Sequence, residues 1–211
     1  MIKTSAVNTE EFFIKSSRDT IISEERKNLL LKIADFIATT YKQDKVVRLN
    51  FICTHNSRRS QFGQLWSHFA AEYSNLNIHS YSGGTEITAF HKNTVKTLQE
   101  VGFVFKITEF SHQNPVYNIS FENAKRNIVG FSKLYDNPIN ESPFIAITTC
   151  DSADENCPFI PEALSRFHLP YIDPKFSDGT EECQKAYLAT NKQVAAEMFY
   201  VFSTLKKELS N

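Results

Sequence analysis

Cysteine, net charge and long apolar runs are all scarce in this sequence of 211 residues. Its four cysteines are too few for the disulfide scaffold of a small secreted protein, so we expect them to be catalytic, metal-binding or simply buried. A net charge of -1 gives no overall attraction to nucleic acid or to an anionic membrane. No apolar run approaches the roughly 18 residues of a membrane span, and residues 1–11 lack the apolar core of a signal peptide. The sequence therefore predicts a cytoplasmic protein in which any anion binding is local.

The composition is sufficient for one α/β domain with an added element. Hydrophobic residues make up 41% of the chain and include 18 phenylalanines, which supply a core. Residues 1–45 are predicted to form an N-terminal helical extension, and residues 46–211 the main domain. Ser23, followed by Glu24 and Glu25, is a typical helix start. One face of this helix carries Leu29, Leu30, Ile33, Phe36, Ile37 and Tyr41. We expect that face to cover the sheet, with a dimer contact or a partner surface as the alternatives.

The main domain alternates strand and helix patterns, which favours a parallel sheet with crossover helices. Strands are expected over residues 46–52, 77–82, 103–107, 115–121, 128–135 and 144–149, and helices over 61–73, 91–101 and 179–209. The region from 110 to 140 is less regular, and Asn-Pro pairs mark turns in it. A meander or an edge hairpin is predicted there.

Cys53 and Arg59 are separated by five residues, between an apolar strand pattern and a helix pattern. The start of a helix carries positive partial charge and lowers the pKa of a neighbouring thiol from about 8.5. Backbone N–H groups of a tight loop at a helix start bind oxyanions, and an arginine adds a planar fork. Ser60 can donate its hydroxyl to the sulfur. The residues expected to surround an oxyanion are Thr54, His55, Asn56, Ser57, Arg58 and Arg59. The alternative is a buried core cysteine beside an ordinary surface arginine.

A second pair, Cys150 and Cys157, follows the strand pattern at 144–149. Because ligands bind at the carboxyl ends of the strands in an open α/β sheet, we expect this segment to lie on the same rim as the Cys53 loop. Two alternatives remain open. The pair could bind zinc together with His168 or Cys183, although six intervening residues is wide for a zinc pair, or the two cysteines could be unrelated. Cys183 itself is expected to be structural.

Two further features belong near this rim. Asp173 precedes a proline that fixes the local turn, and a positioned carboxyl group can protonate a departing oxygen when a thiolate attacks. The alternative for Asp173 is an ordinary turn at the start of a helix. Gly83 and Gly84 follow the strand pattern at 77–82, and paired glycines predict a tight turn near the first loop.

Together these motifs resemble the low-molecular-weight protein tyrosine phosphatase superfamily, and specifically its thioredoxin-coupled arsenate reductases. The matching residues are Cys53, Thr54, Asn56, Ser57, Arg59, Ser60 and Gln61, then Ser82-Gly83-Gly84, Cys150 to Cys157-Pro158, and Asp173-Pro174. The similarity covers roughly residues 46–209 and implies a four-stranded parallel sheet flanked by helices. His55 stands where the family usually has glycine, and Arg58 replaces a frequent cysteine. Gln64 replaces an acidic residue that helps some members hold potassium, so no metal or other cofactor is expected.

The resemblance implies a relay of three cysteines that reduces arsenate to arsenite. Cys53 would attack arsenate while Asp173 protonates the departing oxygen. Cys150 would then form a disulfide with Cys53, Cys157 would resolve it, and thioredoxin would reduce the Cys150–Cys157 disulfide. A phosphatase would use Cys53, Arg59 and Asp173 on phosphotyrosine or a small phosphate ester without the other cysteines. A third hypothesis is a non-enzymatic module that binds arsenite or an oxyanion.

Overall fold

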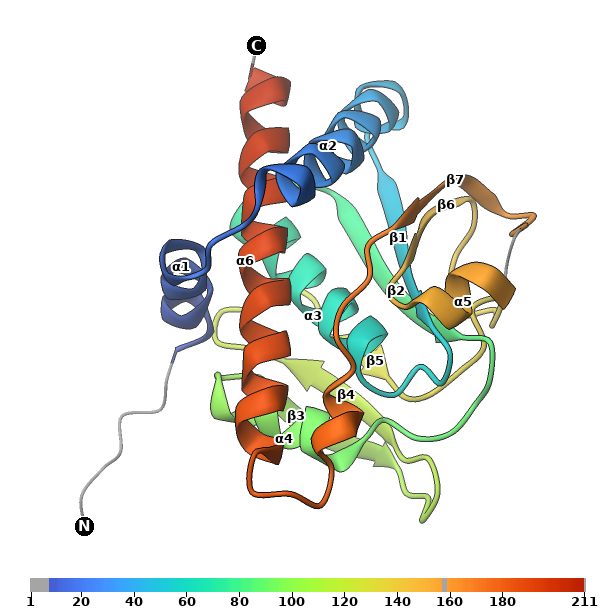
Figure 1. Ribbon diagram of the computed structural model, residues 1–211. Coiled ribbons are helices and arrows are strands. Elements are labelled where there is room, and N and C mark those ends of the chain that lie inside the picture. Colours follow the sequence, from blue (N-terminus) through green and yellow to red (C-terminus); the bar gives the residue numbers. More distant parts are fainter. Residues whose placement is uncertain (1–7, 157–158, 211) are drawn as a thin grey trace.

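A four-stranded parallel sheet forms the centre of the computed structural model, which describes residues 8–156 and 159–210 (Figure 1). Its strand order is β2-β1-β6-β7. The strands are β1 (Val47–Cys53), β2 (Ile78–Gly84), β6 (Phe144–Thr148) and β7 (Ala163–His168). Cys53 is in register with Gly84, and Ile52 with Thr148, so three neighbouring strands end at one edge. The predicted fold class is confirmed, including the helices that precede β1.

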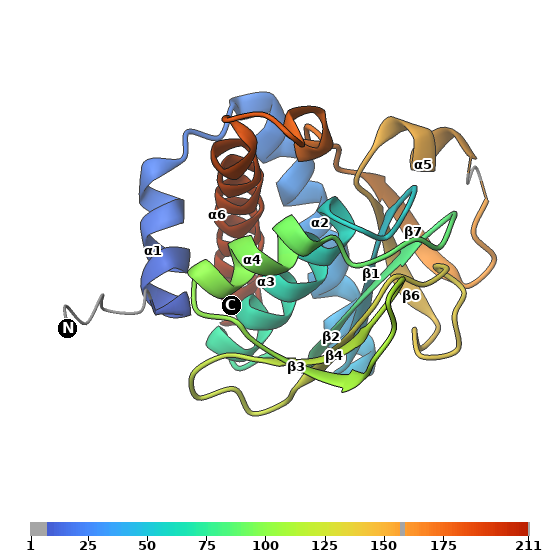
Figure 2. The same ribbon diagram turned by 90° about the horizontal axis from the view of Figure 1, so that it is seen from below.

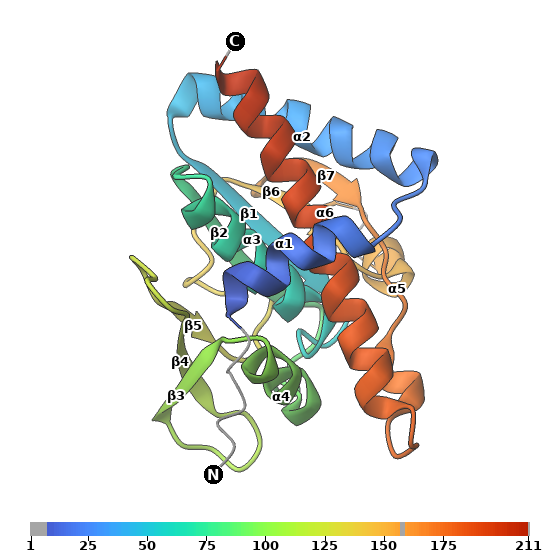
Figure 3. The same cartoon turned by 90° about the vertical axis from the view of Figure 1, so that its left-hand side faces the viewer.

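The helices lie mainly on one face of this sheet. They are α1 (Thr9–Asp19), α2 (Glu24–Asp44), α3 (Arg59–Tyr73), α4 (Lys92–Glu100), α5 (Asp151–Asn156) and α6 (Cys183–Ser210), and a 3-10 turn, η1 (Pro174–Ser177), precedes α6. Figure 3 shows α1 and α2 crossing the long α6 in front of the sheet. No helix within the described ranges is long and apolar enough to cross a membrane.

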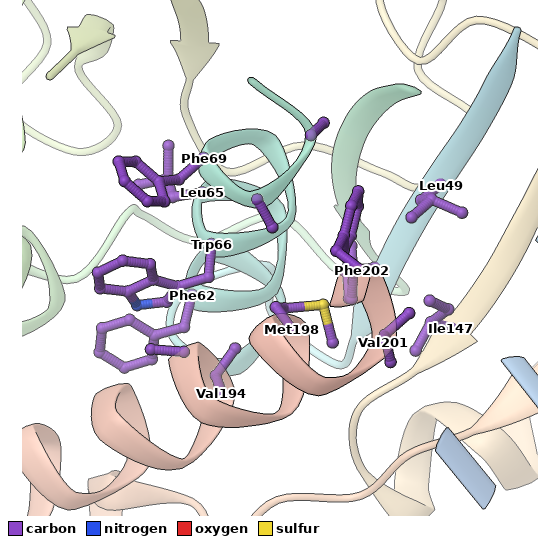
Figure 4. Packing of buried hydrophobic residues seen from close by; sticks show 14 of the residues in the cluster. Leu49, Phe62, Leu65, Trp66, Phe69, Ile147, Val194, Met198, Val201 and Phe202 are labelled. Carbon is purple, nitrogen blue, oxygen red and sulfur yellow. The ribbon is translucent and has the colours of Figure 1, made fainter. Parts of the chain in front are cut away.

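Alternation along β1 separates a large core from a small one. Leu49 and Phe51 belong to the large cluster under α2, α3 and α6, whereas Ile52 belongs to a small cluster on the other face. In Figure 4, Val194 and Met198 of α6 face Phe62 and Trp66 of α3, while Val201 and Phe202 approach Leu49 and Ile147 of the sheet. The large core fixes the helix that follows the Cys53 loop.

The N-terminal helices belong to the large core. Ser23 caps α2 as predicted, its hydroxyl accepting from the backbone N–H of Arg26. The expected buried face of α2 packs in the cluster that α6 shares, so the prediction that it covers the sheet is confirmed. Sequence reasoning did not resolve α1 as a separate helix, and its Phe13 ring stacks on Trp66 with centroids 5.7 Å apart.

The chain between α4 and β6 forms a separate antiparallel sheet (Figure 2). It consists of β3 (Val104–Glu109), β4 (Val116–Ser120) and β5 (Ile128–Gly130). The predicted meander is therefore present, but two expectations were wrong. The strand after α4 joins this sheet and not the parallel one, and β5 ends at Gly130, well before residue 135. The fourth parallel strand is β7, which no sequence pattern had indicated.

Candidate active site

The loop between β1 and α3 presents backbone donors next to the Cys53 sulfur. Its carbonyl groups are held from outside the loop, since those of His55, Asn56 and Ser57 accept from Ser132 Oγ, Gln61 Nε2 and the backbone N–H of His91. Within the described ranges, the backbone N–H groups of residues 55–58 donate to no protein acceptor. Converging free N–H groups at a helix start bind anions.

Ser60 links the sulfur to the loop. The Cys53 thiol is 3% exposed and lies 3.0 Å from the Ser60 hydroxyl. Asn56 Nδ2 donates to the same hydroxyl at 2.9 Å, which leaves the hydroxyl proton available to the sulfur. Asn56 is also the loop residue with a left-handed backbone, at φ 45°, a conformation that asparagine tolerates better than most residues. This geometry matches the predicted role of Ser60.

Gly83 and Gly84 let neighbouring backbone segments approach β2 closely and do not form a turn, because β2 continues through both of them. A Cβ on Gly84 would lie 2.7 Å from the Thr54 carbonyl oxygen and 2.8 Å from the Asn56 nitrogen. A Cβ on Gly83 would lie 2.2 Å from the Tyr135 Cα. The end of β2 therefore supports the loop backbone from behind, and the predicted tight turn was wrong.

The side chain of His55 lies toward Glu86, with Nε2 3.2 Å from the carboxylate. It is 38% exposed, and its backbone is outside the left-handed region, so glycine is not required at this position. The substitution of the family's glycine is therefore compatible with the loop conformation.

Asp173 and Arg59 meet at the mouth of the loop. Arg59 donates one guanidinium nitrogen to Asp173 at 2.6 Å and the other to the carbonyl oxygen of Tyr171 at 3.3 Å. The second Asp173 oxygen accepts from the backbone N–H of Lys175 and caps η1. Asp173 therefore starts a helical turn, as the alternative expectation had it, and it also faces the arginine. Its role as a proton donor stays a prediction.

Arg58 is directed away from the loop mouth. Its Nε donates to the Tyr187 hydroxyl at 2.6 Å and a terminal nitrogen donates to Asp178 at 2.7 Å. His91 Nδ1 lies 3.0 Å from the same hydroxyl. The Arg58 side chain, which was expected to help surround an oxyanion, is therefore paired with Asp178 instead. Sequence spacing gave no signal for this cluster, which joins α4, α6 and the segment after η1.

Cys150 lies against the Cys53 loop, as predicted from the strand ends. Its sulfur is 3.5 Å from the Thr54 hydroxyl, and both cysteines belong to the small core cluster. The segment that follows is the helix α5, and Asp154 fixes it by accepting hydrogen bonds from Thr148 and Arg166. Cys157 lies outside the described residues.

The other candidate metal ligands are dispersed. His168 lies beside Asp151 and Asp154, whereas Cys183 on α6 accepts a hydrogen bond from Asn93 at 3.2 Å. In the part of the chain that the structure describes, no three His, Cys, Asp or Glu side chains are grouped to hold a metal ion. Cys183 is half-buried, and its thiol also contacts Asp178 at 3.7 Å, so it belongs to the side-chain cluster around Arg58.

Lys133, which sequence reasoning missed, contacts the loop through its backbone. The backbone N–H of Lys133 donates to Asn56 Oδ1 at 3.0 Å. Its side chain is 1% exposed, and its ammonium nitrogen has no hydrogen-bond partner among the described residues. Burial lowers the pKa of Lys133 to about 7.

Lys133→Met is expected to stabilise the protein near neutral pH. Between about pH 7 and 10.5 the unfolded chain keeps the lysine proton and the native chain releases it, so stability falls as the pH drops through this window. By urea unfolding, the variant should gain about 4 kcal/mol at pH 7 and about 1 kcal/mol at pH 9.5. The exposed Lys106→Met is the matched control. An equal gain at both pH values would contradict the titration of Lys133.

Two solved structures that share this fold are phosphatases. An arginine phosphatase with a phosphorylated active-site serine superposes with a TM-score of 0.52 at 15% identity, over 76% of this chain and 97% of that one. A low-molecular-weight protein tyrosine phosphatase from Bacillus subtilis gives 0.51 at 16% identity, over 76% and 98%. The fold is therefore that of low-molecular-weight protein tyrosine phosphatases.

Sequence comparison gives the family. An arsenate reductase from Bacillus subtilis (strain 168) is 30% identical over 137 residues, which cover 65% of this chain and 81% of the relative. An arsenate reductase from Bacillus licheniformis is 30% identical over 139 residues, with the same coverage of 65% and 81%. No protein-family model matches the sequence. The chain belongs to the arsenate reductase family, as the motifs had indicated.

Proposed function

We propose that this protein reduces arsenate to arsenite through Cys53, Cys150 and Cys157, with thioredoxin as the reductant. The observation that carries the proposal is the position of Cys150. Its buried sulfur contacts Thr54, the residue next to Cys53, on the loop whose free N–H groups suit a tetrahedral anion. A phosphatase has no chemical need for a second thiol at that position.

In the first step, the Cys53 thiolate attacks arsenic and one oxygen leaves as water. Loop N–H groups and the Arg59 fork would hold the remaining oxygens, and Asp173 would supply the proton. Arg59 now pairs with Asp173 at 2.6 Å, so an arriving oxyanion would take over donors of Arg59 and release the carboxyl group.

In the second step, the Cys150 thiolate attacks the Cys53 sulfur. A Cys53–Cys150 disulfide forms, the sulfur–arsenic bond breaks, and its electron pair stays on arsenic, which leaves as arsenite. Cys157 then attacks Cys150 and frees the Cys53 thiolate. A dithiol of thioredoxin reduces the Cys150–Cys157 disulfide and is itself oxidised. Because the relay starts from reduced thiols, the proposal places the protein in the cytoplasm.

Phosphate-ester hydrolysis is the second candidate, and the fold of the two phosphatases favours it. Cys53, Arg59 and Asp173 would serve that reaction in the same roles, with a phosphoryl group in place of arsenate. A third candidate, a module that only binds arsenite or an oxyanion, would not need the Asp173–Arg59 pair.

Thioredoxin-coupled turnover of arsenate tests the proposal. Wild-type protein with thioredoxin, its reductase and NADPH is expected to oxidise NADPH when arsenate is added, with arsenite formed in equal amount. Cys53→Ser should lower this rate by at least about 10³-fold, because the nucleophile is removed. Arsenate binding without NADPH oxidation would support the binding module. Hydrolysis of an aryl phosphate without arsenate turnover would support the phosphatase.

A further inference from the structure

Two adjacent arginines lie at the end of the loop that follows Cys53, residues 54–59, which we call the anion loop. They bind two carboxylates at the ends of one short segment. Arg59 pairs with Asp173 at 2.6 Å, and Arg58 pairs with Asp178 at 2.7 Å. The 3-10 turn η1 lies between these two aspartates. Figure 1 shows this orange turn beside the first turns of α6 and the green start of α4.

The second pair is embedded in a partly buried hydrogen-bond network. The Tyr187 hydroxyl donates to Asp178 at 2.9 Å, and Asn93 Nδ2 donates to the same carboxylate oxygen at 3.1 Å. The Tyr187 side chain is fully buried and stacks on His91 with ring centroids 5.8 Å apart. His91 Nε2 faces the second carboxylate oxygen at 3.8 Å.

The charges in this network favour a permanent ion pair. Burial on its own would raise the pKa of Asp178, but hydrogen bonds from Tyr187 and Arg58 outweigh it and hold the pKa below its usual value. Burial, and then the charge of Arg58, lower the pKa of His91. At neutral pH the cluster therefore contains one cation, Arg58, and one anion, Asp178, and neither group changes its charge near neutral pH.

The two ion pairs differ in whether an oxyanion can compete with the carboxylate for the arginine. The Arg59 guanidinium lies at the loop mouth, where an oxyanion would displace Asp173. Arg58 has its donors on Asp178 and Tyr187 inside the network, so the same oxyanion leaves this pair intact. When the first pair opens, the second still ties the segment to the loop.

We propose that Asp178 is a positioning residue. Through its ion pair with Arg58 it keeps the segment that carries Asp173 docked on the anion loop when Arg59 releases Asp173 and binds the oxyanion. This role rests on the proposed function, because it assumes that Asp173 donates a proton during the reaction. Asp178 itself does not touch the reacting atoms.

Kinetics of Asp178→Asn provide the first test. The amide keeps the shape of the side chain but loses its charge, so kcat for arsenate is expected to fall about 10- to 100-fold with KM changed less than about threefold. Asp173→Asn should cost about 10²-fold. The double variant should be no slower than Asp173→Asn alone, since Asp178 acts only through Asp173. Costs that multiply in the double variant would overturn the proposal.

Two further variants separate positioning from a folding defect. Tyr187→Phe removes one hydroxyl from the network and should lower kcat about threefold to tenfold, while the melting temperature falls by only about 10 °C or less and the protein stays folded at the assay temperature. Asp19→Asn removes a surface carboxylate that pairs with Lys192 at 3.3 Å, and it should leave both kcat and KM unchanged.

Hydrogen–deuterium exchange tests the docking without any reaction. In substrate-free Asp178→Asn, peptides covering residues 171–182 should exchange at least about fivefold faster than in wild type, while Asp19→Asn matches wild type. Unchanged exchange would overturn the docking role even in an active enzyme. A wild type that turns over no arsenate would end the proposed function, and faster exchange in the variant would still support the docking.

Discussion

Turnover of arsenate is expected to stop in Cys150→Ser, while hydrolysis of an aryl phosphate continues within about twofold of wild type. Serine cannot attack the Cys53 sulfur, so thioredoxin-coupled turnover should fall at least about 10³-fold. Cys53, Arg59 and Asp173 remain in place, because serine is nearly the size of cysteine and among the described residues the Cys150 thiol has one hydrogen bond to the loop, with the Thr54 hydroxyl at 3.5 Å. Coupled NADPH oxidation and release of 4-nitrophenol measure the two reactions.

The fourth cysteine provides the control for this experiment. Cys183→Ser replaces a half-buried thiol on α6, outside the small core cluster that contains Cys53 and Cys150. It should lower arsenate turnover by about tenfold or less, because this thiol contacts only the Asp178 network and takes no part in the relay. Retained arsenate turnover in Cys150→Ser would exclude the relay, and equal loss of both reactions would indicate that the substitution had damaged the loop.

Arg59→Lys should lower kcat/KM for arsenate and for an aryl phosphate alike, by about 10³-fold. Lysine keeps the positive charge and can still pair with Asp173, but it lacks the planar fork that binds two oxygens of a tetrahedral anion. Steady-state kinetics with both substrates measure the loss.

Arg48→Lys is the matched control for this substitution. Arg48 lies near the opposite end of β1 and pairs with Glu141 at 2.9 Å, so no effect on kcat/KM is expected. A loss of less than about tenfold in Arg59→Lys would mean that charge alone, without the fork, accounts for binding.

The features that sequence reasoning found share a strong local signal. Ser23 marked the start of α2, and its apolar spacing predicted the buried face. The Cys53 loop was recognised because a strand, a cysteine, an arginine and a helix follow each other within a short stretch. Asp173 was found through the proline that fixes its turn, whereas its ion pair with Arg59 emerged only from the structure.

The features that sequence reasoning missed depend on tertiary contacts. Leu164 of β7 is 49% exposed, so this edge strand has no apolar alternation to reveal it. The helix α5 has six mostly polar residues and is fixed by Thr148 and Arg166 from neighbouring strands. Nothing in the spacing of Arg58, Asp178 and Tyr187 indicates that three distant segments bring them together.

The packing of α1 on Trp66 supplies an intrinsic fluorophore for this enzyme. Trp66 is the chain's only tryptophan, it is fully buried, and the rings of Phe12 and Phe13 stack on it. Its indole nitrogen donates to Asn191 of α6 at 2.7 Å, so its emission senses α1, α3 and α6 together. Detachment of the first helix alone would change this signal before the sheet unfolds.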